Sequence, residues 1–152
     1  MRLQESSRLA LLAVLECAAD AERHVAAADI AQKYGASAHH LAKVLADLAR
    51  AGVVASVRGA GGGYRFVANA RRLTLHDVIV RFEELAPAGA RGPETGDRTP
   101  AGRAVAIVLA EIDEIALATF RSITIATMLR IMERQVVPDV GRRGAAKRKS
   151  SG

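Results

Sequence analysis

The fold of this chain is limited most strongly by a pair of helix-forming segments joined by a tight turn. A glycine-rich hairpin follows the second segment directly. Residues 27–34 carry apolar side chains at helical spacing and end at Gly35, a residue that commonly terminates helices in the left-handed conformation. Ser37 can cap the next helix, in which an apolar stripe runs from Leu41 to Leu48 at i, i+3, i+4 and i+7. This order predicts a helix-turn-helix.

The flanking segments complete a small, mainly helical domain. Residues 7–19 are rich in Leu and Ala and predict a preceding helix, whereas Val53–Val57 and Tyr64–Val67 predict two strands paired across a turn. Half of the residues are apolar but only 3 % are aromatic, so a core of Ala, Leu, Val and Ile is expected. We therefore predict a mainly α fold, a winged helix-turn-helix with a two-stranded β wing.

The turn between the predicted strands has four glycines in five residues, 59–63. Glycine permits positive φ and close approach to another chain, and the flanking Arg58 and Arg65 add positive charge. These properties are typical of a wing that contacts DNA, with Arg58 placed to enter a minor groove. A nucleotide-phosphate loop is the alternative, but such a loop is followed by a helix, whereas Tyr64–Val67 reads as a strand.

The polar side of the third predicted helix supplies the candidate base-reading residues. The first turn of a recognition helix usually reaches base edges, and here it holds Ser37, Ala38 and His39. His39 and His40 can donate to base or phosphate acceptors, and Lys43 can neutralise a phosphate or reach a guanine edge. The alternative is that these residues form only the solvated face of an amphipathic helix.

The second half of the chain predicts a linker and a long helix suited to self-association. Thr74 can cap a linker helix through residue 85, and Thr99 with Pro100 can begin the long helix. An apolar seam with the spacing of a and d positions is expected to pack in a dimer, or alternatively against the chain's own winged domain. Its residues are Val105, Val108, Leu109, Ile112, Ile115, Ala116 and Thr119. Residues 128–132 extend this apolar surface into a last helix that could cover a partner's dimer helix.

Charge and cysteine content narrow the functional class. The chain holds 22 basic and 16 acidic residues, and residues 139–152 alone hold 5 basic and 1 acidic, so this tail is expected to be disordered and to touch polyanions without reading sequence. Cys17 is the single cysteine, which excludes an internal disulfide framework and favours a reducing compartment; we expect it to be a small buried side chain. No charge-free apolar run is long enough to span a membrane, so we expect a cytoplasmic protein.

Three stretches of this sequence resemble the Rrf-two family of bacterial winged-helix regulators, to which IscR and NsrR belong. They are MRLQESSRLALLAVLECAA, ADIAQKYGASAHHLAKVLADLARAGVVASVRGAGGGYRFV and LTLHDVIVRFE. The resemblance is close over residues 1–86 and weaker to about residue 134. It implies a homodimeric transcription factor that binds a partly palindromic operator with its recognition helix, its wing and an N-terminal arm. The DNA-contacting residues that it implies are Arg2, Gln4, Ser37, His39, His40, Lys43, Arg58, Gly59, Gly61, Gly62, Gly63 and Tyr64.

One departure from the family pattern affects its chemistry. Sensing members hold an iron-sulfur cluster with three closely spaced cysteines after the linker helix, and the matching stretch here, residues 86–103, contains none. Because thiolates are the ligands that such a cluster needs, we expect no cluster in this chain. His24 and His76 lie far apart with no partner at i, i+4, so we expect no other metal site, and we expect no cofactor.

The expected organisation has five parts. They are a winged helix-turn-helix DNA-binding domain (1–72), a linker helix (73–86), a flexible loop (87–100), dimerisation helices (101–138) and a disordered basic tail (139–152). No catalytic constellation is visible, so we expect a DNA-binding regulator, a repressor, that binds double-stranded DNA as a homodimer. The alternatives are a winged-helix interaction module with only non-specific nucleic-acid affinity, and a phosphate-binding enzyme that uses the glycine turn. A small-molecule or protein effector is left open.

Overall fold

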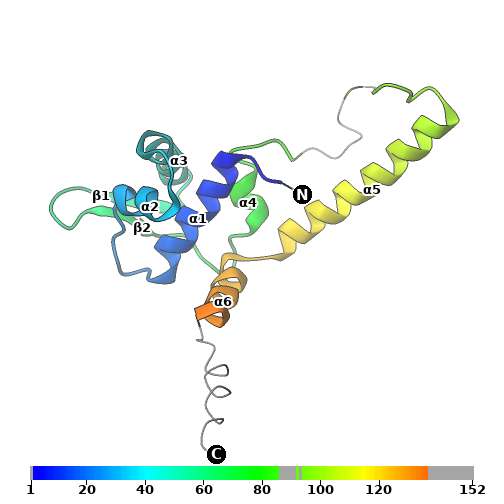
Figure 1. The fold of residues 1–152 in the computed structure, drawn as a ribbon. Coiled ribbons are helices and arrows are strands. Elements are labelled where there is room, and N and C mark those ends of the chain that lie inside the picture. The colour runs from blue at the N-terminus through cyan, green and yellow to red at the C-terminus, as the bar shows by residue number, and fades with distance from the viewer. Residues whose placement is uncertain (1, 86–91, 93, 137–152) are drawn as a thin grey trace, which may run out of the picture.

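A computed structural model of the chain describes residues 2–85, 92 and 94–136, and Figure 1 shows their arrangement. The expected tail of residues 139–152 lies outside this range, as does much of the expected loop of residues 87–100. The helices are α1 (Glu5–Ala19), α2 (Ala27–Tyr34), α3 (Ala38–Arg50), α4 (Leu75–Ile79), α5 (Pro100–Ser122) and α6 (Ile125–Val136), and the strands are β1 (Val54–Val57) and β2 (Gly63–Phe66).

Helices α1, α2 and α3 pack into the core of the first half, as the mainly α winged-helix prediction requires. The apolar stripe of α3 is fully covered, since Leu41, Leu45 and Leu48 have no exposed surface. Ser37 caps α3 by accepting a hydrogen bond from the backbone N–H of His40. Gly35 ends α2 at φ 63°, which a residue with a Cβ adopts only with strain.

The two strands form an antiparallel pair in which Val54 faces Phe66 and Val57 faces Gly63. Their bounds confirm the predicted hairpin to within one residue. The sequence did not predict that a third backbone segment pairs with this hairpin. Val25, which precedes α2, pairs with Tyr64 of β2 through an isolated antiparallel bridge. The wing is therefore joined along β2 to the chain that leads into the helix-turn-helix.

The predicted linker helix through residue 85 is too long, because α4 ends at Ile79. A capping box between Thr74 and Asp77 starts the helix as expected. After Ile79 the backbone tightens into a turn in which the N–H of Phe82 donates to the carbonyl of Ile79, 2.9 Å away. Phe82 and Leu85, in and after this turn, pack against the core.

Helix α5 begins at the predicted cap, where the Thr99 hydroxyl accepts from the N–H of Gly102 and Pro100 takes the first position. Figure 1 shows α5 extending away from the winged domain, whereas α6 folds back beside it. Met128, Leu129 and Met132 of α6 pack against the chain's own core. The expectation that this apolar surface, which also includes Ile131, covers a partner's helix stays a prediction, because Ile131 is 42 % exposed and the other three side chains are only half-buried.

The elbow between α5 and α6 is held by backbone pairing with the segment that precedes α4. Thr74 pairs with Thr124, the N–H of Leu75 donates to the carbonyl of Ile123, and the N–H of Ile125 donates to that of Leu73, each at 2.9 Å. These bonds fix the direction in which α5 leaves the winged domain.

Candidate nucleic-acid interface

The outer side of α3 presents a short run of small and polar side chains to solvent. Ser37, Ala38, His39 and Lys43 are exposed, as expected for residues that reach base edges. Ala42 is exposed between them and was missed by sequence reasoning, because an alanine gives no polar signal. Its methyl group is the kind of surface that can contact the methyl of thymine.

His40 lies in a different environment from its neighbour His39. Its side chain is 32 % exposed, and both ring nitrogens face the first turn of α1. Nε2 lies 2.9 Å from the Ser6 hydroxyl oxygen, and Nδ1 lies 3.9 Å from a carboxylate oxygen of Glu5. The structure therefore separates the two predicted histidines: His39 is exposed to solvent and His40 is attached to α1.

The wing also divides into a tip and a base. Arg58, Gly59 and Gly61 are exposed at the tip, where both glycines have positive φ. Gly62 and Gly63 are half-buried at the base. Tyr64 is partly buried against the core and shares backbone hydrogen bonds with residue 25, so its place in the fold is structural.

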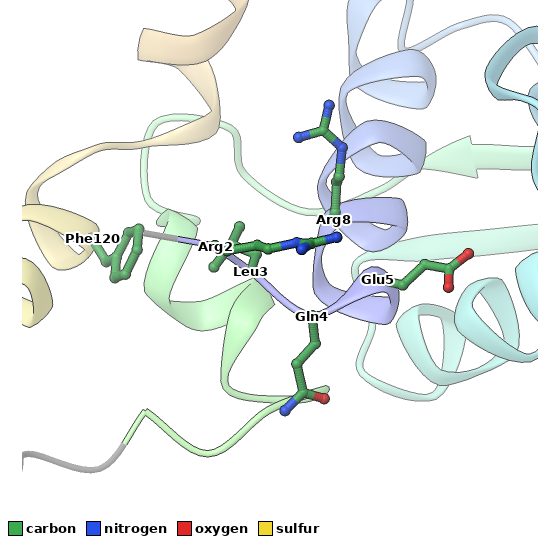
Figure 2. A pocket seen from close by; sticks show the side chains of 6 residues that line it. All are labelled: Arg2, Leu3, Gln4, Glu5, Arg8 and Phe120. Atoms are coloured by element: carbon green, nitrogen blue, oxygen red, sulfur yellow. The ribbon is translucent and has the colours of Figure 1, made fainter.

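The predicted N-terminal arm lies between α1, the end of the linker and the end of α5. Arg2 and Gln4 are exposed, and the backbone N–H of Gln4 donates to a Glu83 carboxylate oxygen at 3.3 Å. An open groove of about 900 Å³ runs along the arm (Figure 2). Its lining residues are Arg2, Leu3, Gln4, Glu5, Arg8 and Phe120. The contribution of Phe120 is not predictable from sequence, because this residue is far from the arm along the chain.

An ionic contact between Glu16 and Lys33 holds α2 against α1. Glu16 accepts a hydrogen bond from Lys33 at 2.6 Å and another from the Tyr34 hydroxyl. Burial alone would raise the pKa of Glu16, but the hydrogen bonds from Lys33 and Tyr34 outweigh burial and lower it. Burial and the bond to Glu16 raise the pKa of Tyr34 to about 12.

Cys17 is fully buried in α1. Burial, with a smaller effect from the charge of Glu16, raises the pKa of its thiol to about 11. A buried protonated thiol is a poor metal ligand, and a cluster would need further cysteines that this chain lacks. The residues present therefore do not fit an iron-sulfur cluster. Residues 2–85, 92 and 94–136 also hold no group of three or more potential metal-ligating His, Cys, Asp or Glu side chains.

The predicted seam of α5 is exposed along most of its length. Val105, Val108, Leu109, Ile112 and Ile115 are each between 46 and 61 % exposed, and Ala116 is half-buried. The contact of α5 with its own winged domain uses a different face, which includes Leu117 and Phe120. The alternative that the seam packs on the chain's own winged domain is therefore wrong for the described part of the chain. Ile107, 68 % exposed, is an apolar neighbour that the heptad spacing missed.

In the described part of the chain, none of the helices has the length and apolar character needed to cross a bilayer. Three surface features remain to be explained: the exposed polar side of α3, the exposed Arg58 at the wing tip and the exposed apolar seam of α5.

Comparisons with known proteins match these features. The model of the Rrf2 family, described as iron-dependent transcriptional regulators, matches residues 3–131. The HTH-type transcriptional regulator BadM of Rhodopseudomonas palustris is 46 % identical over 153 residues, which cover 99 % of this chain and 96 % of that protein. IscR of Vibrio campbellii is 39 % identical over 85 residues, 55 % of this chain and 51 % of IscR.

Solved structures show the same architecture. CymR, the global cysteine regulator of B. subtilis, superposes with a TM-score of 0.71 at 25 % identity, covering 86 % of this chain and 98 % of CymR. IscR of T. potens superposes with a TM-score of 0.67 at 26 % identity, covering 91 % and 93 % of the two chains. The predicted fold, the family resemblance and the expectation of a regulator rather than an enzyme are confirmed. The chain is a DNA-binding transcriptional regulator and belongs to the Rrf2 family.

Proposed function

We propose that this regulator acts as a homodimeric repressor that binds a partly palindromic operator in the cytoplasm, without an iron-sulfur cluster. The observation that carries the proposal is the pairing, in one folded unit, of an exposed reading face on α3 with an uncovered apolar seam on α5. A reading face needs a second copy to recognise a palindrome, and the seam offers the surface for that copy.

The contacts proposed with DNA follow from exposure. His39 and Lys43, with Ser37 at the helix start, are directed to base edges and phosphates in the major groove. Arg58 and the tip glycines approach the adjacent backbone or minor groove. Arg2 and Gln4 of the arm are proposed to lie near the phosphates.

Dimerisation through α5 supports repression by simple occlusion. Apolar side chains that are more than half exposed on a helix of 23 residues are unusual in a monomer, and a second α5 would remove them from water. A dimer on its operator covers both half-sites, about one helical turn or a multiple apart, and so blocks access to promoter DNA.

The test is selection of bound duplexes from a random library by the purified protein at two salt concentrations. We expect enrichment of an inverted repeat that survives the higher salt, followed by inhibition of transcription in vitro from a promoter that contains the repeat. Binding without enrichment that disappears as salt rises would instead support an interaction module with only non-specific affinity. If the protein stimulates transcription from the promoter that contains the enriched repeat, operator binding is supported but the repressor role is rejected.

A further inference from the structure

The two ring nitrogens of His40 are the starting point for a reassignment within the recognition helix. A side chain that reads a base must turn at least one donor or acceptor toward the DNA. The Nε2 of His40 lies 2.9 Å from Ser6 Oγ, and Nδ1 lies on the side of Glu5, 3.9 Å from its carboxylate. While these contacts exist, Nε2 is occupied by Ser6, and Nδ1 faces Glu5 at a distance too long for a hydrogen bond.

His40 lies in the first turn of α3, so its contact with α1 affects how the start of this helix is held. His40 is the third residue of the helix, and its backbone N–H donates to the capping hydroxyl of Ser37. The cap therefore determines where α3 begins, and the side chain attaches that same turn to α1. The next residue, Leu41, is fully buried in the core. The first turn of α3 is thus held to α1 on its polar side as well as on its apolar side.

The segment that receives His40 is itself anchored. Glu5 and Ser6 form the first turn of α1, and the N–H of Gln4 just before them donates to Glu83, after α4. The segment Gln4–Ser6 therefore has contacts both with the chain that leads toward α5 and with the recognition helix. We name this segment with His40 the arm clamp.

We propose that His40 is a positioning residue rather than a base-reading residue, and that the arm clamp sets the angle at which α3 enters the major groove. This inference rests on the proposed function and deepens it. His39, one position earlier and exposed, keeps the direct role. A small change in the angle of α3 would displace His39 and Lys43 together, because both project from the same rigid helix.

The experiment is a double-mutant cycle with Ser6→Ala, His40→Ala and the double variant, each titrated against the selected duplex. We expect each single variant to bind about three- to tenfold more weakly, as for the loss of one hydrogen bond. The double variant should bind no more weakly than His40→Ala, because either change removes the same contact. Ser6→Thr, which keeps the hydroxyl, should restore binding.

His39→Ala provides the contrast. It should weaken binding, and the weakening should be smaller in the Ser6→Ala background, because the positioning contact acts on binding through His39 and Lys43. The same cycle measured by urea unfolding should show coupling between Ser6 and His40 and none between Ser6 and His39. Wild-type binding by Ser6→Ala, or multiplicative losses in Ser6→Ala/His40→Ala, would overturn the positioning role. Failure of the wild type to enrich any duplex would instead reject the proposed function, and the positioning role with it, whatever the unfolding data show.

Discussion

The backbones of Val25 and Tyr64 exchange two hydrogen bonds, each of 2.8 Å. This pairing attaches β2 of the wing to the segment that leads into α2. It brings the carbonyl of Val25 so close to Gly63 that a Cβ built on the glycine would lie 2.6 Å from that oxygen. Gly63 also has a φ of 145°. Two independent constraints therefore require glycine at this position.

We expect Gly63→Ala to lower the free energy of unfolding by about 2–4 kcal/mol, from backbone strain plus the clash with Val25. Gly61→Ala is the matched control, because Gly61 also has positive φ but has open space around its Cβ position. It should cost about 1 kcal/mol. Urea unfolding followed by circular dichroism measures both, and equal losses would contradict a role for the Val25 contact.

The contact of Glu16 with Lys33 and Tyr34 predicts a pH dependence of stability. The folded pKa of Glu16 lies below its ordinary value of 4.5, so its contribution is present above that value and is lost as the pH falls through the folded pKa. Glu16→Gln should therefore lower stability at pH 7 by about 1 kcal/mol, a modest value because Lys33 is mostly exposed.

The measurement is urea unfolding of wild type and Glu16→Gln from pH 7 down to pH 3. The difference between them should shrink as the pH falls. Asp77 also has a lowered pKa, so its contribution to stability is also lost as the pH falls. Because Asp77 is present in both proteins, its contribution cancels in the difference between them. A difference that stays constant across this range would reject the ionic contribution of Glu16.

Cys17 should be chemically silent in the folded protein. Because its pKa is raised to about 11 and its side chain is buried, almost no accessible thiolate is present at pH 8. Mass spectrometry after treatment with iodoacetamide should show no adduct on the native protein and full alkylation in urea. Rapid modification of the native protein would reopen a redox role for this residue.

Lys43 and Arg58 should affect DNA binding in different ways. Lys43→Ala should weaken binding and should reduce the slope of log Kd against log salt concentration by about 1, because one phosphate contact is lost. Arg58→Ala should mainly relax the sequence preference at the base pairs of the operator that lie next to the wing. Arg121→Ala, on the exposed surface of α5, is the charge-matched control. If Lys43→Ala and Arg58→Ala both bind the duplex as tightly as Arg121→Ala does, with the same sequence preference and salt dependence, the proposed contacts are rejected.

The α5 seam predicts the oligomeric state. Ile112→Asp places a charge in the middle of the proposed interface and should convert a dimer to a monomer in sedimentation equilibrium, since burial of an unpaired carboxylate is costly. Helical content should persist, because Ile112 is 55 % exposed within one chain. Glu111→Gln is the neighbouring control. A monomeric wild type, or a variant that remains dimeric, would contradict dimerisation through this seam.

Local patterns in the sequence were sufficient for the fold of the first half and for the identity of the family. The spacing of Leu41 to Leu48 requires one face of α3 to be buried, so the opposite face had to be exposed. Gly35 and Ser37 mark the turn by chemistry that acts within a few residues. For the same reason the start of α5 at Thr99 was predictable.

Contacts between distant segments required the tertiary structure. Periodicity states that the apolar face of α6 must be covered, but not that Met128 packs against the core of its own chain. It places His39 and His40 side by side, but the partner of His40 is 34 residues away. Periodicity also does not place the end of α4 at Ile79, because the helical spacing of Val78, Ile79 and Phe82 continues past that residue.

The sequence by itself thus determined which residues form the reading helix, the wing and the apolar seam, because those follow from periodicity and capping, whereas the exposure of the seam came from the tertiary structure. The tertiary structure alone decided which of the exposed residues are free to meet DNA. That choice depends on long-range packing: the same fold that buries the apolar face of α3 brings Ser6 to His40 and leaves His39 in solvent.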